Sequence, residues 1–331
     1  MKEQRPNLVY IFPDEYRQQA LGFWDDGDPV LTPNLNRLAS DGLLLTHAVS
    51  NFPVCSPYRG MLMTGKYPFS NGVIGNCSSR TIKYGIELSA SERCLSDVLS
   101  DAGYSLGYIG KWHLDMPQEE HIPFTEGWRG KPGEGSFWDT YTPPGPRRHG
   151  FDFWHAYGCC DQHLTPHYWE GDARIDERID VNEWSVKHET DVAVDYLHNH
   201  SGEMRDDERP FALFVAYNPP HMPFDQVPPE YREPYADESP EALLTRPNGR
   251  TEGEGAEAPE VVRNYFAAVT GIDEQVGRIL DALDETGLAE DTIVIFTSDH
   301  GEMMGSQDRM HKVVWFDESL LVPFIIRWPG R

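Results

Sequence analysis

The chain has 331 residues, enough to bury a large core as one α/β domain or two smaller ones. Asp and Glu outnumber Lys and Arg by 54 to 28, and the formal net charge of −26 argues against a nucleic-acid or anionic-membrane surface, for which a basic face is expected. No apolar segment approaches the length of a membrane span, and the first residues lack the apolar core of a signal peptide. The sequence as written therefore predicts a cytoplasmic protein, and it would equally suit a periplasmic or secreted one from which a leader has been removed.

Short apolar runs alternate with helical patterns along the chain, which predicts an α/β fold with a large, mixed, mostly parallel sheet flanked by helices. Buried strands are predicted at four short apolar runs, residues 7–12, 105–109, 211–217 and 292–297. Helices are predicted where apolar side chains recur with helical spacing, around residues 95–102, 186–197 and 261–283. In the first of these, Leu95, Val98, Leu99 and Ala102 mark the apolar face. Gly287 is expected to end the last helix before the strand at 292–297.

Two stretches interrupt this alternation. Residues 222–260 are rich in Pro, Glu and Gly and predict a long surface loop or a mobile flap. Residues 115–184 form an insertion crowded with aromatic rings, which either bind sugar rings or pin the insertion to the core. The rings in question belong to Trp128, Trp138, Trp154, His155, His163, His167, Tyr168 and Trp169. Among them we take His163, His167 and Tyr168 as candidate substrate-binding residues.

Acidic residues directly follow two of the predicted strands, as Asp14-Glu15 and as Asp299-His300. Ligands gather at the carboxyl ends of parallel strands, so the two pairs are expected to meet there. Carboxylate oxygens favour a hard cation such as calcium or magnesium. Taken singly, each Asp could instead cap the following helix.

The five cysteines have irregular spacing without a Cys-x-x-Cys pair, which indicates neither a disulfide framework nor a zinc ribbon. One of them opens the sequence Cys55-Ser-Pro-Tyr-Arg59, and Cys-x-Pro-x-Arg is the signal by which cysteine is oxidised to the aldehyde formylglycine. The motif continues to Pro68, and in this stretch the chain resembles the type I sulfatases of the alkaline phosphatase superfamily. Further motifs of that family follow in the same order, Gly110-Lys-Trp-His113, Asn218-Pro-Pro-His221, His311-Lys312 and Trp328-Pro-Gly330.

The resemblance implies hydrolysis of a sulfate monoester, on a carbohydrate or another sulfated small molecule. Cys55 would be converted by a formylglycine-generating enzyme, and the hydrated aldehyde would attack sulfur with one hydroxyl and release sulfate through the other. Arg59 would orient this residue, and Lys111 would neutralise the sulfate oxygens together with Lys312. His113 would deprotonate the remaining hydroxyl. His221, with Lys312, would protonate the leaving oxygen.

The resemblance also implies a divalent metal, calcium or alternatively magnesium or manganese, held by Asp14, Glu15, Asp299, His300 and the modified Cys55. Glu15 departs from the pattern, since the family more often has Asp there. Residues 1–331 would form the N-terminal catalytic domain, and the smaller C-terminal antiparallel domain of the family is expected to be missing or truncated. Two alternatives stay open, a phosphonate monoester or phosphodiester hydrolase of the same superfamily and a non-catalytic protein that binds sulfated glycans.

Overall fold

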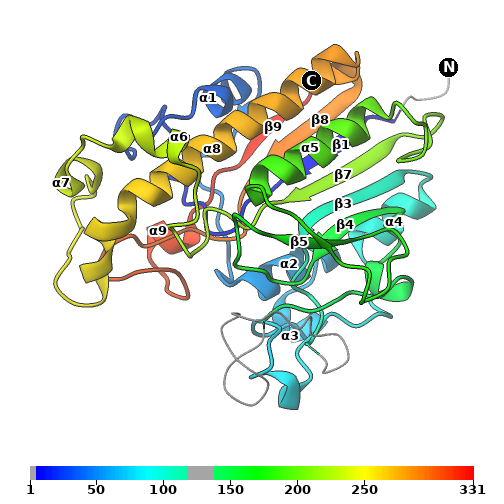
Figure 1. Cartoon of the computed structure of the whole chain (residues 1–331), viewed down its shortest axis with the longest axis horizontal. Helices are drawn as coiled ribbons and strands as arrows, with labels where there is room; N and C mark the ends of the chain where they lie inside the picture. The colour runs from blue at the N-terminus through cyan, green and yellow to red at the C-terminus, as the bar shows by residue number, and fades with distance from the viewer. Residues whose placement is uncertain (1–4, 118–137) are drawn as a thin grey trace.

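A nine-stranded sheet forms the centre of the computed structural model, which describes residues 5–117 and 138–331 (Figure 1). Expectations for residues 118–137, including Trp128, lie outside the described residues. The strands are β1 (Asn7–Ile11), β2 (Leu43–Leu44), β3 (Ser105–Lys111), β4 (Phe153–Tyr157), β5 (His167–Glu170), β6 (Ile179–Asp180), β7 (Phe211–Ala216), β8 (Thr292–Phe296) and β9 (Ile325–Arg327). Their order in the sheet is β2-β9-β8-β1-β7-β3-β4-β5-β6.

The five central strands, β8-β1-β7-β3-β4, are parallel, and the strands outside them are antiparallel. Val9 of β1 aligns with Leu213 of β7 on one side and with Val294 of β8 on the other. All three side chains are fully buried. The mixed, centrally parallel sheet confirms the predicted fold class, and the four predicted strands correspond to β1, β3, β7 and β8.

Helices cover both faces of this sheet, as its doubly apolar strands require. In the described part of the chain the α-helices are α1 (Pro33–Ser40), α2 (Cys55–Thr64), α3 (Pro68–Asn71), α4 (Leu95–Asp101), α5 (Ser185–His198), α6 (Pro229–Arg232), α7 (Pro240–Leu243), α8 (Ala258–Glu285) and α9 (Asp317–Leu320). Helices α1, α5 and α8 pack on the face that contains Val9 and Ile11, and α2 packs on the face that contains Tyr10 and Phe12. Figure 1 shows α5 and α8 crossing in front of the sheet, with α2 and α4 behind it.

The three predicted helices exist as α4, α5 and α8, and α8 ends at Glu285, two residues before Gly287. One detail of the prediction is wrong. Leu95 and Val98 of α4 were expected on its buried face, but their side chains are 36% and 47% exposed. The seven residues of α4 form about two turns, so only Leu99 and Ala102 pack against the core.

Residues 222–260, for which the composition predicted a long surface loop or a mobile flap, include short stretches of regular structure. They contain the short helices α6 and α7 and two 3₁₀ turns, Glu233–Tyr235 and Glu254–Glu257. The buried side chains of Tyr231, Tyr235 and Leu243 anchor the segment to the core beside α8. Apolar anchors at irregular spacing carry no helical or strand period, and the composition therefore concealed them.

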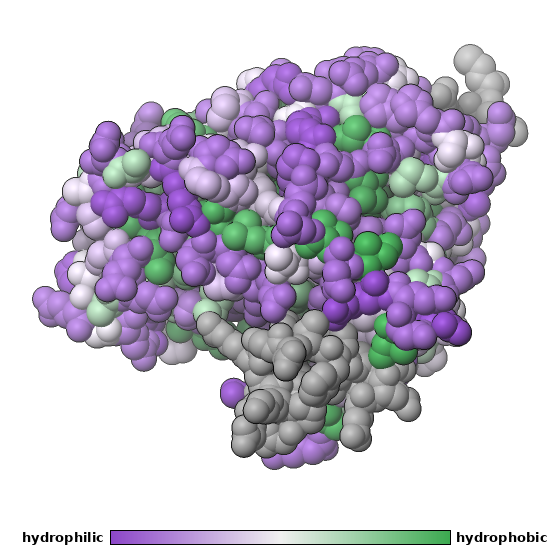
Figure 2. Space-filling view, in the orientation of Figure 1, coloured by the Kyte–Doolittle hydropathy of each residue, from purple (hydrophilic) through white to green (hydrophobic). Residues whose placement is uncertain are grey.

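The surface over α5 and α8 is predominantly hydrophilic, with apolar side chains scattered between polar ones (Figure 2). Within residues 5–117 and 138–331, no helix combines the length and apolar character needed to cross a membrane.

Candidate active site

The predicted site residues converge at the carboxyl ends of the central parallel strands. Asp14 lies beyond β1, Lys111 ends β3, His221 lies beyond β7 and Asp299 lies beyond β8. Cys55 enters the same region from the N-terminus of α2. A cavity of about 550 Å³ opens here and is lined by Cys55, Asn76, Lys111, His113, Trp138, Cys159, Asp161, Gln162, His221, Met222, Pro223, Asp225, Gln226 and Lys312.

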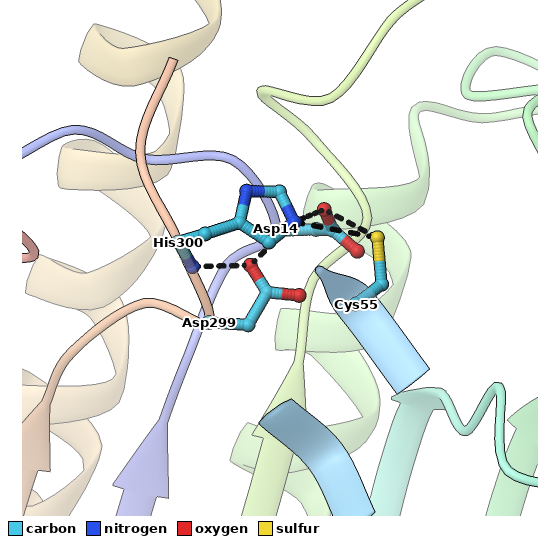
Figure 3. A group of neighbouring side chains, drawn as sticks. All are labelled: Asp14, Cys55, Asp299 and His300. Atoms are coloured by element: carbon cyan, nitrogen blue, oxygen red, sulfur yellow. Dashed lines mark hydrogen bonds and ion pairs between the residues drawn. The ribbon is translucent and has the colours of Figure 1, made fainter. Parts of the chain in front are cut away.

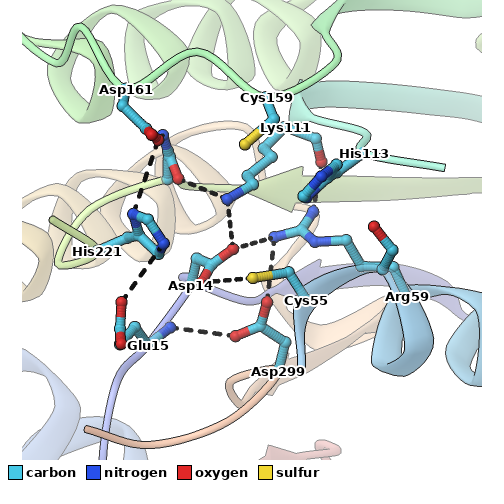
Figure 4. Close-up of polar contacts among 12 residues, drawn as sticks. Asp14, Glu15, Cys55, Arg59, Lys111, His113, Cys159, Asp161, His221 and Asp299 are labelled. Carbon is cyan, nitrogen blue, oxygen red and sulfur yellow. Dashed lines mark hydrogen bonds and ion pairs between the residues drawn. The ribbon is translucent and has the colours of Figure 1, made fainter. Parts of the chain in front are cut away.

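Cys55 and Arg59 lie one turn apart on α2, on the face that the sheet buries. Their side chains are 1% exposed. Arg59 donates one hydrogen bond to the Lys111 carbonyl oxygen, and its Nη2 lies 3.4 Å from Asp14 Oδ2 and 3.5 Å from Asp299 Oδ2 (Figure 4). The guanidinium therefore ties α2 to the ends of three strands and fixes where Cys55 meets the cavity.

Four predicted ligands, Asp14, Cys55, Asp299 and His300, form what we call the first cluster (Figure 3). One ligand atom from each lies within 4.8 Å of all the others, and all four side chains are buried. His300 Nε2 is 3.3 Å from Cys55 Sγ, 3.4 Å from Asp14 Oδ1 and 3.5 Å from Asp299 Oδ1.

These spacings suit atoms that share one ion. Burial alone would lower the pKa of His300, but Asp299 and then Cys55 together outweigh burial and raise this pKa to about 10, so the first cluster attracts positive charge. Two carboxylates, an imidazole and position 55 can therefore hold a divalent cation.

Glu15, the fifth predicted ligand, faces a different set of groups. Its backbone has a positive φ of 68°, and its Oε2 lies 2.9 Å from Lys312 Nζ and 3.5 Å from His221 Nε2. Burial opposes ionisation of Glu15, but Lys312 and then His221 outweigh burial and hold the pKa of this carboxyl well below its usual value. The longer side chain of Glu thus reaches the cations on the far side of the cavity.

Lys111 sits at the base of the cavity and is fully buried. Its Nζ lies 2.7 Å from Asp14 Oδ2 and donates a hydrogen bond of 2.8 Å to Asn218 Oδ1. Burial lowers the pKa of Lys111, yet Asp14, Cys159 and Cys55 together outweigh burial and raise this pKa well above its usual value. The preceding Gly110 has φ of 96°, and a Cβ there would lie 2.3 Å from the Ala216 carbonyl oxygen, so only glycine lets β3 deliver Lys111 so close to β7.

His113 offers an unprotonated nitrogen to the site. Its Nε2 lies 3.1 Å from the Cys77 carbonyl oxygen, which only accepts hydrogen bonds, so Nε2 carries the proton and Nδ1 the lone pair. Nδ1 is buried without a partner. Burial, then the charges of Lys111 and Arg59, hold the pKa of His113 well below its usual value. The ring is therefore neutral and can accept a proton.

Hydrogen bonds hold both the ring and the backbone of His221. Its Nδ1 donates a hydrogen bond of 2.6 Å to the Met222 carbonyl oxygen, which leaves Nε2 facing Glu15. Burial and then Lys312 lower the pKa of His221 to about 4. His163 Nε2 donates to the His221 carbonyl oxygen at 2.9 Å, so His163 supports His221 from behind.

The candidate substrate-binding residues do not line the cavity. Tyr168 is fully buried and donates a hydrogen bond of 2.9 Å to Glu189 Oε1, and His167, 3% exposed, lies 2.7 Å from Asp139 Oδ2. His163, which is 2% exposed, is buried as well, so the structure places all three side chains in the core, and their contact with substrate stays a prediction. The insertion uses these rings to attach itself to the core. Trp138, from the same insertion, does line the cavity.

Several cavity residues were missed by the sequence reading. Cys159 and Asp161 follow β4, whose sequence Phe-Trp-His-Ala-Tyr is short and interrupted by His155, so it did not stand out as a buried strand. Asn218 Nδ2 donates to the Asp161 side chain at 3.2 Å while its Oδ1 accepts from Lys111. Asn218 was signalled by its position directly after a predicted strand and by the Asn218-Pro-Pro-His221 motif, but neither signal assigned it a role beside Lys111.

Comparison with known proteins agrees with this geometry. The sulfatase family model matches residues 6–331. The chain belongs to the sulfatase family. It is 42% identical to an endo-4-O-sulfatase of Bacteroides thetaiotaomicron, covering 99% of this chain and 65% of the relative, and 36% identical to an ulvan-active sulfatase of Formosa agariphila, covering 98% and 57%. The chain thus spans about three fifths of the length of these relatives.

The fold of this chain also closely matches that of a solved structure. The crystal structure of the Bacteroides fragilis protein yidJ has a TM-score of 0.91 and 46% identity, covering 99% of this chain and 69% of that one. The family implies a formylglycine and a divalent metal, and the donor set of the first cluster fits such an ion.

Proposed function

We propose that this protein is a formylglycine-dependent sulfatase that hydrolyses a sulfate monoester on a carbohydrate. The observation that carries the proposal is the convergence of Cys55 with Lys111, His113, His221 and Lys312 around one cavity. A sulfate ester presents negative oxygens on every side, and this set provides a reactive position facing cations and imidazoles.

The site would need two groups that the amino-acid sequence does not encode, an aldehyde made at position 55 during maturation and a divalent ion taken up from solution. A hydrated aldehyde at position 55 supplies a nucleophilic hydroxyl and a second hydroxyl from which sulfate can be released. A divalent ion, which we propose to be calcium, would be held by Asp14, Asp299 and His300 and would supply positive charge beside that nucleophile.

Lys111 and Lys312 would bind the sulfate oxygens. Both ammonium groups stay charged because a buried carboxylate pairs with each, Asp14 with Lys111 and Glu15 with Lys312. These pairs also prevent the long side chains from moving away from the cavity. The cations would thus be in position before the substrate arrives. Electrostatic stabilisation is most effective when the charges are preorganised in this way.

His113 would act as the base. Its Nδ1 lone pair faces a buried site beside Lys111 and Arg59, and the depressed pKa keeps that lone pair available at neutral pH. The proton taken from position 55 would reside on Nδ1 while Nε2 keeps its hydrogen bond to Cys77.

His221 and Lys312 would serve the leaving oxygen. Burial and then Lys312 lower the pKa of His221, and a bound sulfate anion would offset the charge of Lys312 and favour protonation of the imidazole. The His221 Nε2 proton would then pass to the alcohol oxygen as the ester bond breaks.

A carbohydrate substrate is supported by the names of the two relatives, one acting on 4-O-sulfate groups and one active on ulvan. Trp138 and the polar side chains of Asp161, Gln162 and Asp225 line the cavity, a composition suited to the mixed apolar and hydroxyl faces of a sugar ring.

The first test is the mass of the proteolytic peptide that contains Cys55, from protein produced together with a formylglycine-generating enzyme, followed by sulfate release from 4-O-sulfated and 6-O-sulfated glycans and ulvan. We expect the aldehyde mass and release of inorganic sulfate, both lost in Cys55→Ala. A retained thiol in correctly produced protein, with glycan binding but no sulfate release, would favour the binding-protein alternative. Faster turnover of a phosphonate ester than of any sulfate ester would favour the phosphonate hydrolase.

A further inference from the structure

The cavity contains an acidic side chain to which the proposed mechanism gives no part in the reaction. Asp161 lines the cavity together with the cations Lys111 and Lys312, and its side chain is 41% exposed. A carboxylate in the same cavity weakens the attraction that these cations exert on a sulfate anion, because like charges repel. Its presence is explained if another part of the substrate donates a hydrogen bond to it.

Hydrogen bonds hold Asp161 in one position. Its Oδ1 accepts a hydrogen bond of 3.2 Å from Asn218 Nδ2, and its carbonyl oxygen accepts one of 3.3 Å from Gln226 Nε2. The orientation of the Asn218 amide is itself fixed, because its Oδ1 accepts from Lys111 and its Nδ2 donates to the Cys160 carbonyl oxygen at 2.7 Å. The Asp161 carboxylate is therefore in place before a substrate binds, which lowers the entropic cost of using it.

The second carboxylate oxygen of Asp161 is available to a ligand. In the described part of the chain, no group donates a hydrogen bond to Asp161 Oδ2. His221 Nδ1 lies 3.7 Å from Oδ1, too far for a hydrogen bond, and donates to the Met222 carbonyl oxygen instead. Asp161 is therefore not the group that orients the His221 ring.

Asp161 lies on the side of the cavity where the leaving group is expected. Figure 4 shows His221 between Asp161 and Glu15. Under the proposed function, His221 donates a proton to the oxygen that joins sulfate to the sugar, so the sugar ring lies beside His221 and its substituents face Asp161. Hydroxyl groups are the donors that a sugar ring carries, and a hydroxyl that donates to a carboxylate forms a strong, charge-assisted hydrogen bond.

We propose that Asp161 Oδ2 accepts a hydrogen bond from a free hydroxyl of the sugar ring that carries the scissile sulfate. This inference rests on the proposed function and extends it to the substrate class, a sulfated sugar ring with an unsubstituted hydroxyl at one particular position. A second sulfate at that position would face the Asp161 carboxylate and be repelled. Asp161 thus determines specificity and takes no part in breaking the ester bond.

Deoxy analogues of one sulfated monosaccharide test this contact. Each analogue lacks one ring hydroxyl, and a parallel set carries a second sulfate at the same positions. For the wild type, Asp161→Ala and Asp161→Asn, kcat/KM for sulfate release is divided by the value of the same protein on nitrophenyl sulfate. That ester has no sugar, so a general loss of activity cancels. Asp172→Ala, which removes an exposed acid of the same insertion outside the cavity, is the matched control.

In the wild type and in Asp172→Ala, we expect the loss of one particular hydroxyl to lower the normalised kcat/KM by about 10- to 100-fold, the range for a hydrogen bond to a charged group. In Asp161→Ala, the loss of the same hydroxyl should have almost no effect. Asp161→Asn removes the repelling charge and directs its amide hydrogens into the cavity. It should therefore cleave the analogue with a second sulfate at that position at least about tenfold better than the wild type does.

The same dependence on every hydroxyl in the wild type and in Asp161→Ala would overturn the proposal. A loss in Asp161→Ala on an unsubstituted alkyl sulfate as large as that on the sugar sulfate would also overturn it, since Asp161 would then act through His221. Failure of the proposed function is distinguishable, because the wild type would release no sulfate from any ester, nitrophenyl sulfate included. In that case the same ratios are taken from dissociation constants measured by calorimetry, and they decide the contact with Asp161 in the same way.

Discussion

Glu189 should make the protein less stable as the pH rises from 5 to 8. The residue lies on α5 with a fully buried side chain, and its Oε1 accepts hydrogen bonds of 2.9 Å from Tyr168 and 3.3 Å from Tyr157. Its Oε2 is buried without a partner. Burial raises the pKa of Glu189 from 4.5 to about 8.

The sign follows from proton binding in the two states. Between pH 4.5 and pH 8 the folded protein keeps a proton on Glu189 that the unfolded chain has released, so unfolding becomes easier as the pH rises through this window. At about 1.4 kcal/mol per unit of pKa shift, Glu189 removes about 3–4 kcal/mol of unfolding free energy between pH 5 and pH 8. Glu189→Gln keeps an acceptor for both tyrosines and carries no charge, so it should not show this loss.

Urea unfolding followed by tryptophan fluorescence, at several pH values, measures the difference between the wild type and Glu189→Gln. All other titrating groups are common to both proteins and cancel in that difference. The difference should grow by about 3–4 kcal/mol toward pH 8. Glu260→Gln, an exposed change on α8, should track the wild type. Parallel curves for Glu189→Gln and the wild type would refute a protonated Glu189.

Three further outcomes are expected. His113→Ala should lower kcat for sulfate esters by about 10²–10⁴-fold with KM little changed, since the base acts after binding, and an equal effect on KM would contradict that role. His221→Ala should lose about 10²–10⁴-fold on alkyl sulfates and much less on nitrophenyl sulfate, whose leaving group needs no proton; equal losses would exclude proton donation. Arg17→Met should lower the free energy of unfolding, measured in urea, by about 3–5 kcal/mol. The change removes two hydrogen bonds of 2.7 Å from Arg17 to Asp28 and leaves the Asp28 carboxylate buried without its cation. A loss below about 1 kcal/mol would mean that water reaches Asp28.

The fold and the meeting of the site residues were predictable because both follow from the strands. A buried parallel strand is a continuous apolar run, and each such run ends at the same edge of the sheet. Asp14 and Asp299 directly follow two of these runs, so their proximity required no knowledge of loops. The strands β4, β5 and β6 escaped prediction because they carry His155, His167 and exposed polar side chains, which obscure their period.

The sequence could not predict the direction in which the site side chains point. His167, Tyr168 and Trp169 are consecutive residues of β5 and point alternately to its two sides, and only the packing of the insertion shows that all three are buried. The direction of Glu15 depends on Lys312, a residue 297 positions away that reaches it from a turn without regular structure. Sequence patterns report local period, whereas these directions are set by contacts between distant segments.

The position of Glu15 also bears on how so acidic a chain can form an anion-binding cavity. Each cation there is held by a buried carboxylate, Lys111 and Arg59 by Asp14, and Lys312 by Glu15. Asp14 and Glu15 are not among the residues that line the cavity, whereas Lys111 and Lys312 are, together with the acidic Asp161 and Asp225. Exposed acidic residues farther away than about 8 Å are screened at physiological salt. The net charge of −26 thus describes the chain as a whole, while the local field in the cavity is set by Lys111 and Lys312 together with the carboxylates that pair with them.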